Sequence, residues 1–313
     1  MLKNFLTAIL CASVVIFSAK VSAAELEMVS YSAQVKLQWL AAAGVPEAKK
    51  ILNKLGQVNI YSEKNLRDYD RIEKVNSIFQ ELVYAATVQY VQQNDYKSIL
   101  DIGGGYTPRA MVFAREGRKY FGGELMAIAV SADEVMKKIL PARQMKNIVY
   151  DEVLAEDNDA FLTAAAALDG KICIVEQGLM IYLTQERLAA MYENIRDVLK
   201  QNGGCMITSD LMTRELFMDI ASALYGEEQA QILYDETKDM YEELFYGLLN
   251  EENFNDRLEA IQFARDELNL KIHPVPLILD ASKLYCTKKL TAEQAEKIEQ
   301  IAAKKYLWVI TAE

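Results

Sequence analysis

The stretch between residues 98 and 124 constrains the fold of this chain more than any other. An apolar run, Ser98–Ile102, is followed by three consecutive glycines: Gly103, Gly104 and Gly105. Such glycines let the backbone turn tightly and approach a ligand without a Cβ in the way. A second apolar run then ends in Glu124, and an acid at this spacing can accept hydrogen bonds from a ribose diol. The stretch predicts a nucleoside site at the carboxyl edge of a parallel sheet.

The details of the glycine loop separate the nucleosides that it could bind. A dinucleotide fingerprint has a third glycine, G-x-G-x-x-G, but Pro108 takes that place here. Asp101, two residues before the first glycine, would repel a pyrophosphate and could pair with an ammonium group. S-adenosylmethionine carries an ammonium group and no phosphate, so the loop favours it over NAD. A glycine turn that binds nothing is the alternative.

Composition narrows the class of protein. The chain has 313 residues, a length sufficient for one large α/β domain or for one domain with a substantial insertion. Its net charge is -11. Without long basic runs, a nucleic-acid partner and an anionic membrane surface are both disfavoured. One histidine and four cysteines without CxxC spacing predict no metal site. Cys173 and Cys205 lie in apolar runs, and we expect them to be core residues.

The first 25 residues differ in pattern from the remainder of the chain. They contain Lys3, an apolar stretch over residues 5–19 and the tripeptide VSA at residues 21–23. This pattern is typical of a signal peptide and too short for a comfortable membrane span, although Lys20 interrupts it. An upstream extension with Met28 as the true start is the alternative. Because S-adenosylmethionine is a cytosolic metabolite, we expect a cytoplasmic protein without stable membrane insertion, and an exported one if the leader is genuine.

The remaining chain alternates helices and strands. Apolar residues at helical spacing predict a helical N-terminal cap over residues 26–95, followed by an α/β domain over 96–313. Helix starts are expected at Ser131, Thr184 and Thr291, the first and last in capping boxes. The predicted strands are Ser98–Ile102, Lys119–Gly122, Asn147–Tyr150, Lys171–Val175, Gly204–Ser209, Lys271–Leu279 and Lys305–Thr311.

Strands separated by helices imply right-handed crossovers and a doubly wound, mostly parallel, seven-stranded sheet. One of the last two strands could run antiparallel. A helical insertion over residues 213–269 is longer than a usual crossover. It is either a lid over the site or extra core packing with a dimer surface; the sequence leaves the oligomeric state open.

The fourth predicted strand carries a second motif. It ends in Glu176 and Gln177, and Gly178 and Tyr182 follow before the next helix. Acid and amide side chains at a strand tip beside the glycine loop are expected to face the same cleft. An ordinary strand-to-helix turn is the alternative.

Taken together, these motifs resemble those of the leucine carboxyl methyltransferase superfamily, class I methyltransferases that include polyketide O-methyltransferases. The family's G-x-G-x-D-T-R-A is similar to residues 103–110, with Thr107 and Pro108 as departures. Its Y-x-G-x-D-L resembles residues 120–125 (YFGGEL), and its E-G-L-L-M-Y-L resembles residues 177–183 (QGLMIYL). Gln177 therefore stands where the family has glutamate, and Glu176, one residue early, is expected to point away from the cleft.

The resemblance implies a role for several residues toward S-adenosylmethionine. The loop glycines would contact its methionyl part, and Glu124 would hold the ribose hydroxyls. Gln177 would lie beside the amino or sulfonium end, and Asp151 near the adenine amino group. Family members often bind the cofactor carboxylate with a basic residue of the first helix, and Lys36 is in that region.

Methyl transfer from a sulfonium requires a nucleophile held in line with water excluded. A carboxylate acceptor needs no general base, whereas a phenol with a pKa near ~10 usually benefits from one. His273 is the single histidine, and its place beside prolines favours a structural role over that of a base. The acceptor is thus expected to be a carboxylate or hydroxyl of a small molecule or a chain terminus.

Three functions remain compatible with the sequence. The first is a cytoplasmic O-methyltransferase. The second is a binding protein that keeps the fold and pocket but has lost catalysis through the altered loop and Gln177. The third is an exported protein that uses the fold as a scaffold.

Overall fold

A computed structural model describes residues 23–56, 68–210, 213–244, 264–276 and 283–312. The predicted signal-like segment lies outside the described residues, apart from the first residues of the helix that begins at Ala23. None of the helices in the described part is both long and apolar enough to span a membrane.

Seven strands form one sheet in the order β3-β2-β1-β4-β5-β7-β6. The first five run parallel, whereas β7 runs antiparallel to both β5 and β6. The predicted doubly wound, mostly parallel seven-stranded sheet is thereby confirmed. The strands are β1 (Ser98–Ile102), β2 (Lys119–Glu124), β3 (Ile148–Glu152), β4 (Ile172–Glu176), β5 (Gly204–Thr208), β6 (Leu270–Pro276) and β7 (Tyr306–Ala312).

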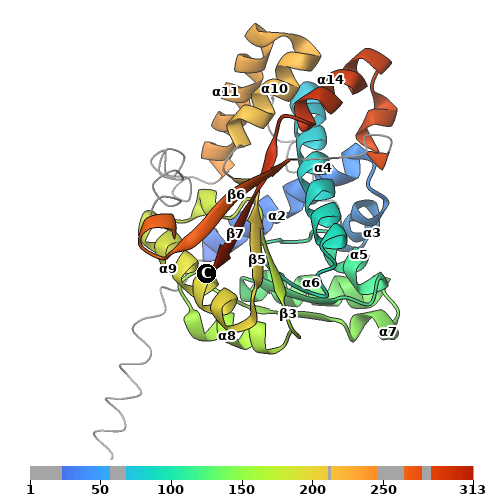
Figure 1. The fold of residues 1–313 in the computed structure, drawn as a ribbon. Coiled ribbons are helices and arrows are strands. Elements are labelled where there is room, and N and C mark those ends of the chain that lie inside the picture. Colours follow the sequence, from blue (N-terminus) through green and yellow to red (C-terminus); the bar gives the residue numbers. More distant parts are fainter. Residues whose placement is uncertain (1–22, 57–67, 211–212, 245–263, 277–282, 313) are drawn as a thin grey trace, which may run out of the picture.

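Helices cover both faces of the sheet (Figure 1). They are α2 (Ala23–Ala43), α3 (Pro46–Leu55), α4 (Tyr69–Gln93), α5 (Arg109–Arg115), α6 (Met126–Ile139), α7 (Ala142–Met145), α8 (Asn158–Ala166), α9 (Gln185–Asn202), α10 (Thr213–Tyr225), α11 (Glu227–Leu244) and α14 (Ala292–Ala302). Two short 3-10 turns, η1 (Met180–Tyr182) and η4 (Cys286–Lys289), complete the described elements.

Alternation along the strands divides the core in two. Ile99 and Val175 point to one face, where α2, α3, α5 and α6 pack. Leu100 and Ile174 point to the other, which α8 and α9 cover. Cys173 and Cys205 are opposite one another in the β4–β5 register and both are buried, which confirms them as core residues.

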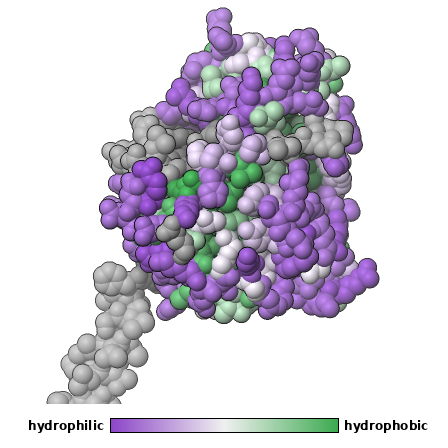
Figure 2. Space-filling model, viewed as in Figure 1, coloured by the Kyte–Doolittle hydropathy of each residue, from purple (hydrophilic) through white to green (hydrophobic). Residues whose placement is uncertain are grey.

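A third cluster joins helices that are far apart in sequence. Buried residues of α4, α10, α11 and α14 pack together, and Figure 1 shows α10, α11 and α14 above the sheet with the upper end of α4 beside them. The described part of the insertion is therefore packed against the N-terminal and C-terminal helices. Figure 2 shows the same side of the molecule as mostly hydrophilic, as expected for a net charge of -11, with hydrophobic side chains gathered in its centre.

Two of the three predicted helix starts are confirmed. Thr184 caps α9 through the N–H of Arg187, and Thr291 forms a capping box with Gln294 at α14. The prediction for Ser131 is wrong, because Ser131 lies inside α6. That helix begins directly after β2, since Ile128 and Ala129 already belong to its buried face; packing outweighs the local capping signal there.

Candidate functional site

The sheet order positions a cleft at the carboxyl end of β1. From β1 the chain proceeds to β2 and β3 on one side, then returns to β4 on the other side. Such a switch point leaves room for a ligand outside the strand ends. A cavity of about 260 Å³ lies there. Its wall combines Ser32, Ala33 and Lys36 of α2 with the glycine loop, Gly123 and Glu124 of β2, residues 153–156 after β3, and Gly178, Leu179, Tyr182, Leu183 and Arg187 after β4.

The glycine loop forms one side of this cavity. Gly103 and Gly105 both have φ +63°, a left-handed conformation that side chains other than glycine rarely adopt. A Cβ on Gly105 would lie 2.7 Å from the Cβ of Ala33, and a Cβ on Gly104 would lie 2.6 Å from Oδ1 of Asp101. Glycine is therefore required both for the turn and for the close approach of α2.

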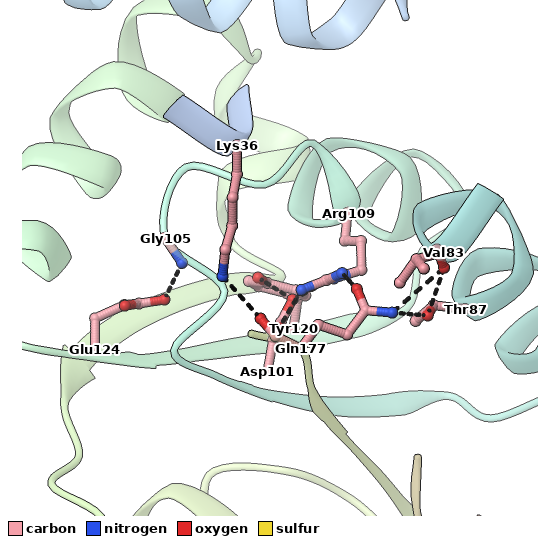
Figure 3. Close-up of polar contacts among 9 residues, drawn as sticks. All are labelled: Lys36, Val83, Thr87, Asp101, Gly105, Arg109, Tyr120, Glu124 and Gln177. Carbon is pink, nitrogen blue, oxygen red and sulfur yellow. Dashed lines mark hydrogen bonds and ion pairs between the residues drawn. The ribbon is translucent and has the colours of Figure 1, made fainter. Parts of the chain in front are cut away.

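Glu124 faces the cavity from the tip of β2, as the sequence predicts. It is 5% exposed, and its Oε1 accepts a hydrogen bond of 2.5 Å from the N–H of Gly105 (Figure 3). Burial, reinforced by the charge of Asp101, raises the pKa of Glu124 to about 8. The acid and the glycine loop are thus joined into one rigid edge.

Asp101 does not line this cavity. It is fully buried, and Arg109 donates to both of its oxygens, from Nε at 2.6 Å and from Nη2 at 2.8 Å. The Tyr120 hydroxyl donates a third hydrogen bond at 2.8 Å. The cation that pairs with Asp101 is therefore the guanidinium of Arg109. The prediction that Asp101 pairs with a ligand ammonium is wrong.

Gln177 also points elsewhere than expected. Its Oε1 accepts from Arg109, and its Nε2 donates to the Thr87 hydroxyl and to the Val83 carbonyl at 3.3 Å (Figure 3). The side chain borders a smaller cavity of about 30 Å³ between α2, α4 and α5. An ionised glutamate could not donate to the Val83 carbonyl, so the amide of Gln177 makes a contact that the family's carboxylate would lack.

Lys36 is brought to the site by α2. Its Nζ donates to the main-chain carbonyls of Gln177 at 3.0 Å and Gly178 at 3.1 Å, which uses two of its three N–H groups. Lys36 borders both cavities. Burial lowers the pKa of Lys36, while Asp210 and Glu176 oppose that effect.

Asp151, Glu176 and His273 do not line the cavity. Asp151 is exposed on the edge strand β3 and does not line the cavity; the segment just after it, residues 153–156, does. Glu176 is buried and faces away from the cavity, as predicted. His273 is exposed on β6, at the opposite edge of the sheet from β3.

Neither composition nor spacing marks Arg109 and Asp210 as residues of this region. The sequence signal for Arg109 is its place in the motif match over residues 103–110, and the signal for Asp210 is only its place after an apolar strand. Within the described residues, no group of three or more His, Cys, Asp and Glu side chains could hold a metal ion.

Comparison with known proteins gives only distant likenesses. No family model matches the chain, and no curated protein sequence matches it. Among solved structures it is similar to the methyltransferase domain of bacterial CtHen1, with TM-score 0.46, 12% identity, and coverage of 75% of this chain and 99% of that one. A putative O-methyltransferase from Nostoc punctiforme gives TM-score 0.42, 9% identity and coverage of 88% and 71%. A putative caffeoyl-CoA O-methyltransferase from Staphylococcus aureus gives TM-score 0.38 and 12% identity, with coverage of 72% of this chain and 81% of that one. No activity follows from these values.

Proposed function

We propose that this chain is an S-adenosylmethionine-dependent O-methyltransferase. The observation that carries the proposal is the edge formed by Gly105 and Glu124: a strand-ending glycine loop hydrogen-bonded to an acid at the tip of the next strand, at the switch point of a doubly wound sheet. That arrangement suits the ribose of a nucleoside. The family resemblance of residues 103–110, 120–125 and 177–183 points to the same cofactor.

Each wall of the cavity would contact a different part of the cofactor. Glu124 would accept hydrogen bonds from the ribose hydroxyls, and the glycine loop would contact the methionyl chain. Lys36 keeps one N–H group for the cofactor carboxylate, with Arg109 nearby at the smaller cavity. The segment 153–156 after β3 would border the base, in place of Asp151.

The chemistry needs little from the side chains beyond positioning. When bound, S-adenosylmethionine supplies an electrophilic methyl group on a sulfonium. Helix α2 covers the glycine loop and would exclude water from the cavity, and the rigid loop would orient the cofactor for an in-line attack. With His273 on a distant edge strand, an acceptor that is ionised without a base fits best: a carboxylate of a small molecule or a chain terminus, in the cytoplasm.

The test is calorimetric titration of the full chain with S-adenosylhomocysteine, in the wild type and in the variants Glu124→Ala and Asp151→Asn. Glu124→Ala removes the contacts to the ribose, and we expect about a tenfold loss of affinity from the loss of two hydrogen bonds. Asp151→Asn, on the neighbouring strand but outside the cavity, serves as the matched control and should bind like the wild type.

The absence of binding to folded wild-type protein would refute the proposal. Binding without turnover against a panel of carboxylic acids and phenols would instead favour the alternative, a catalytically inactive cofactor-binding protein. Equal losses in both variants would contradict the specific role of Glu124, because Asp151 does not line the cavity.

A further inference from the structure

Two acidic side chains lie beneath the loop that follows β4. Glu176 is the last residue of that strand and is fully buried, and Asp210, two residues beyond the end of β5, is 3% exposed. Both carboxyl groups accept from the N–H of Met180, each at 3.2 Å, so they lie against the same main-chain group. Neither lines the cavity, and the function proposed above gives no role to either.

The two carboxyl groups hold three consecutive main-chain N–H groups. Asp210 accepts from Gly178 at 2.6 Å and from Met180 at 3.2 Å. Glu176 accepts from Leu179 at 2.9 Å and from Met180 at 3.2 Å. An unpaired buried N–H group is costly, so these contacts determine the course of the loop.

The same loop contributes to the cavity wall and holds its cation. Gly178 and Leu179 line the cavity. The N–H of Gly178 is held by Asp210 on one side, while its carbonyl accepts from Lys36 on the other, at 3.1 Å. A shift of this loop would therefore displace the ammonium of Lys36 along with the wall.

The charge balance of this region favours one proton on the pair. Two buried carboxylates in contact cannot both ionise at low cost, and burial together with Asp210 raises the pKa of Glu176 well above its ordinary value. The Thr208 hydroxyl donates to Glu176 at 2.7 Å. A pair with one proton carries a single negative charge, which balances the ammonium of Lys36.

Other titratable and charged groups surround the pair on its packed elements. Lys36 approaches from α2. The charge of Asp210 contributes to raising the pKa of Tyr182, which lies on η1. Beyond Lys36 lie Arg109 and Glu124.

We infer that Glu176 and Asp210 share one proton and act as positioning residues of the cavity, fixing the main chain from 178 to 180 and, through it, the ammonium of Lys36. The ligand named for this cavity rests on the proposed function. The hydrogen bonds that Glu176 and Asp210 accept from the loop do not depend on it.

The experiment compares amide exchange and ligand affinity in the full chain. Glu176→Gln has the shape of a protonated carboxyl and can still accept from Leu179 and donate to Asp210, so it should retain wild-type behaviour. Glu176→Ala should speed exchange of the 177–183 peptide and weaken S-adenosylhomocysteine binding, each about tenfold or more, because charge-assisted or buried hydrogen bonds are lost. Glu193→Gln, on the exposed side of α9, controls for an acid-to-amide change.

Two further comparisons test the shared proton. Asp210→Asn places an N–H donor opposite the N–H of Met180, so exchange at that amide should rise. This variant tests the positioning role independently if Glu176→Ala does not fold. In the wild type, protection of the 177–183 peptide, corrected for intrinsic rates, should decrease at alkaline pH as the pair loses its proton, and Glu176→Gln should lack this decrease.

The outcomes separate the two proposals. Glu176→Gln exchanging as fast as Glu176→Ala would overturn the shared proton, and unchanged exchange in Glu176→Ala and Asp210→Asn would overturn the positioning role. A wild type that binds no S-adenosylhomocysteine would refute the proposed function alone, since the exchange measurements need no ligand.

Discussion

Replacing Asp101 by asparagine should destabilise the protein strongly. Asp101 is fully buried and accepts two hydrogen bonds from Arg109 and one from Tyr120. An asparagine offers one oxygen and no charge, which leaves the guanidinium of Arg109, itself 3% exposed, buried without a counter-ion. Breaking a buried pair in this way costs about 3–5 kcal/mol. We expect a loss of that size in the free energy of unfolding.

Urea unfolding followed by circular dichroism measures this loss, with thermal unfolding as a second measurement. For a domain of this size about 1 kcal/mol corresponds to roughly 2–4 °C, so Tm should fall by about 6–20 °C. Asp95→Asn is the matched control, because Asp95 is two-thirds exposed and pairs with Lys97 at 2.5 Å and more distantly with Arg118 at 3.7 Å. An exposed pair contributes little, and we expect no measurable change.

A double-mutant cycle isolates the pair itself. Arg109→Met leaves Asp101 uncompensated and should be as damaging as Asp101→Asn, whereas the double variant should lose less than the sum of the two. A loss below about 1 kcal/mol for Asp101→Asn, within the ordinary range of point substitutions, would refute the reasoning. It would mean that the amide oxygen of Gln177, which already accepts from Arg109, satisfies the guanidinium without a counter-ion.

Three further predictions concern the glycine loop, the acid beside it and the last helix. Gly105→Ala should abolish ligand binding and destabilise the protein, since both its φ of +63° and the contact at 2.7 Å with Ala33 oppose a Cβ; Gly117→Ala, with φ +76° and open space, should show backbone strain alone, measured by titration and thermal unfolding. Because the pKa of Glu124 is raised from 4.5 to about 8, the folded state binds more protons than the unfolded chain between these values, so this carboxyl makes stability fall as pH rises through that window. Glu124→Gln should therefore gain stability relative to the wild type between pH 5 and 8, and a constant difference across urea titrations would contradict this. Thr291→Ala removes the capping box of α14 and should cost about 1 kcal/mol in urea unfolding; a neutral result would mean that packing alone holds the helix end.

The fold could be predicted from the sequence because its signals are local. Strand β1 has the predicted bounds, since an apolar run before glycines has few other conformations. Two caps were found because a threonine bonds an N–H only three residues away. The capping prediction for Ser131 failed where buried residues extend α6 ahead of it. The insertion was recognised by its length, but its packing against α4 and α14 depends on segments far along the chain.

The site divides in the same way. By itself the sequence determined the glycine loop and Glu124, because both depend on a backbone turn and on the edge at which parallel strands end. Only the tertiary structure decided the partners of the other polar groups: Arg109 for Asp101, Val83 and Thr87 for Gln177, and Lys36 for the carbonyl of Gly178. Each buried charge or amide takes the partner that the strand order and helix packing bring within about 3 Å, a pairing that spacing along the chain does not encode.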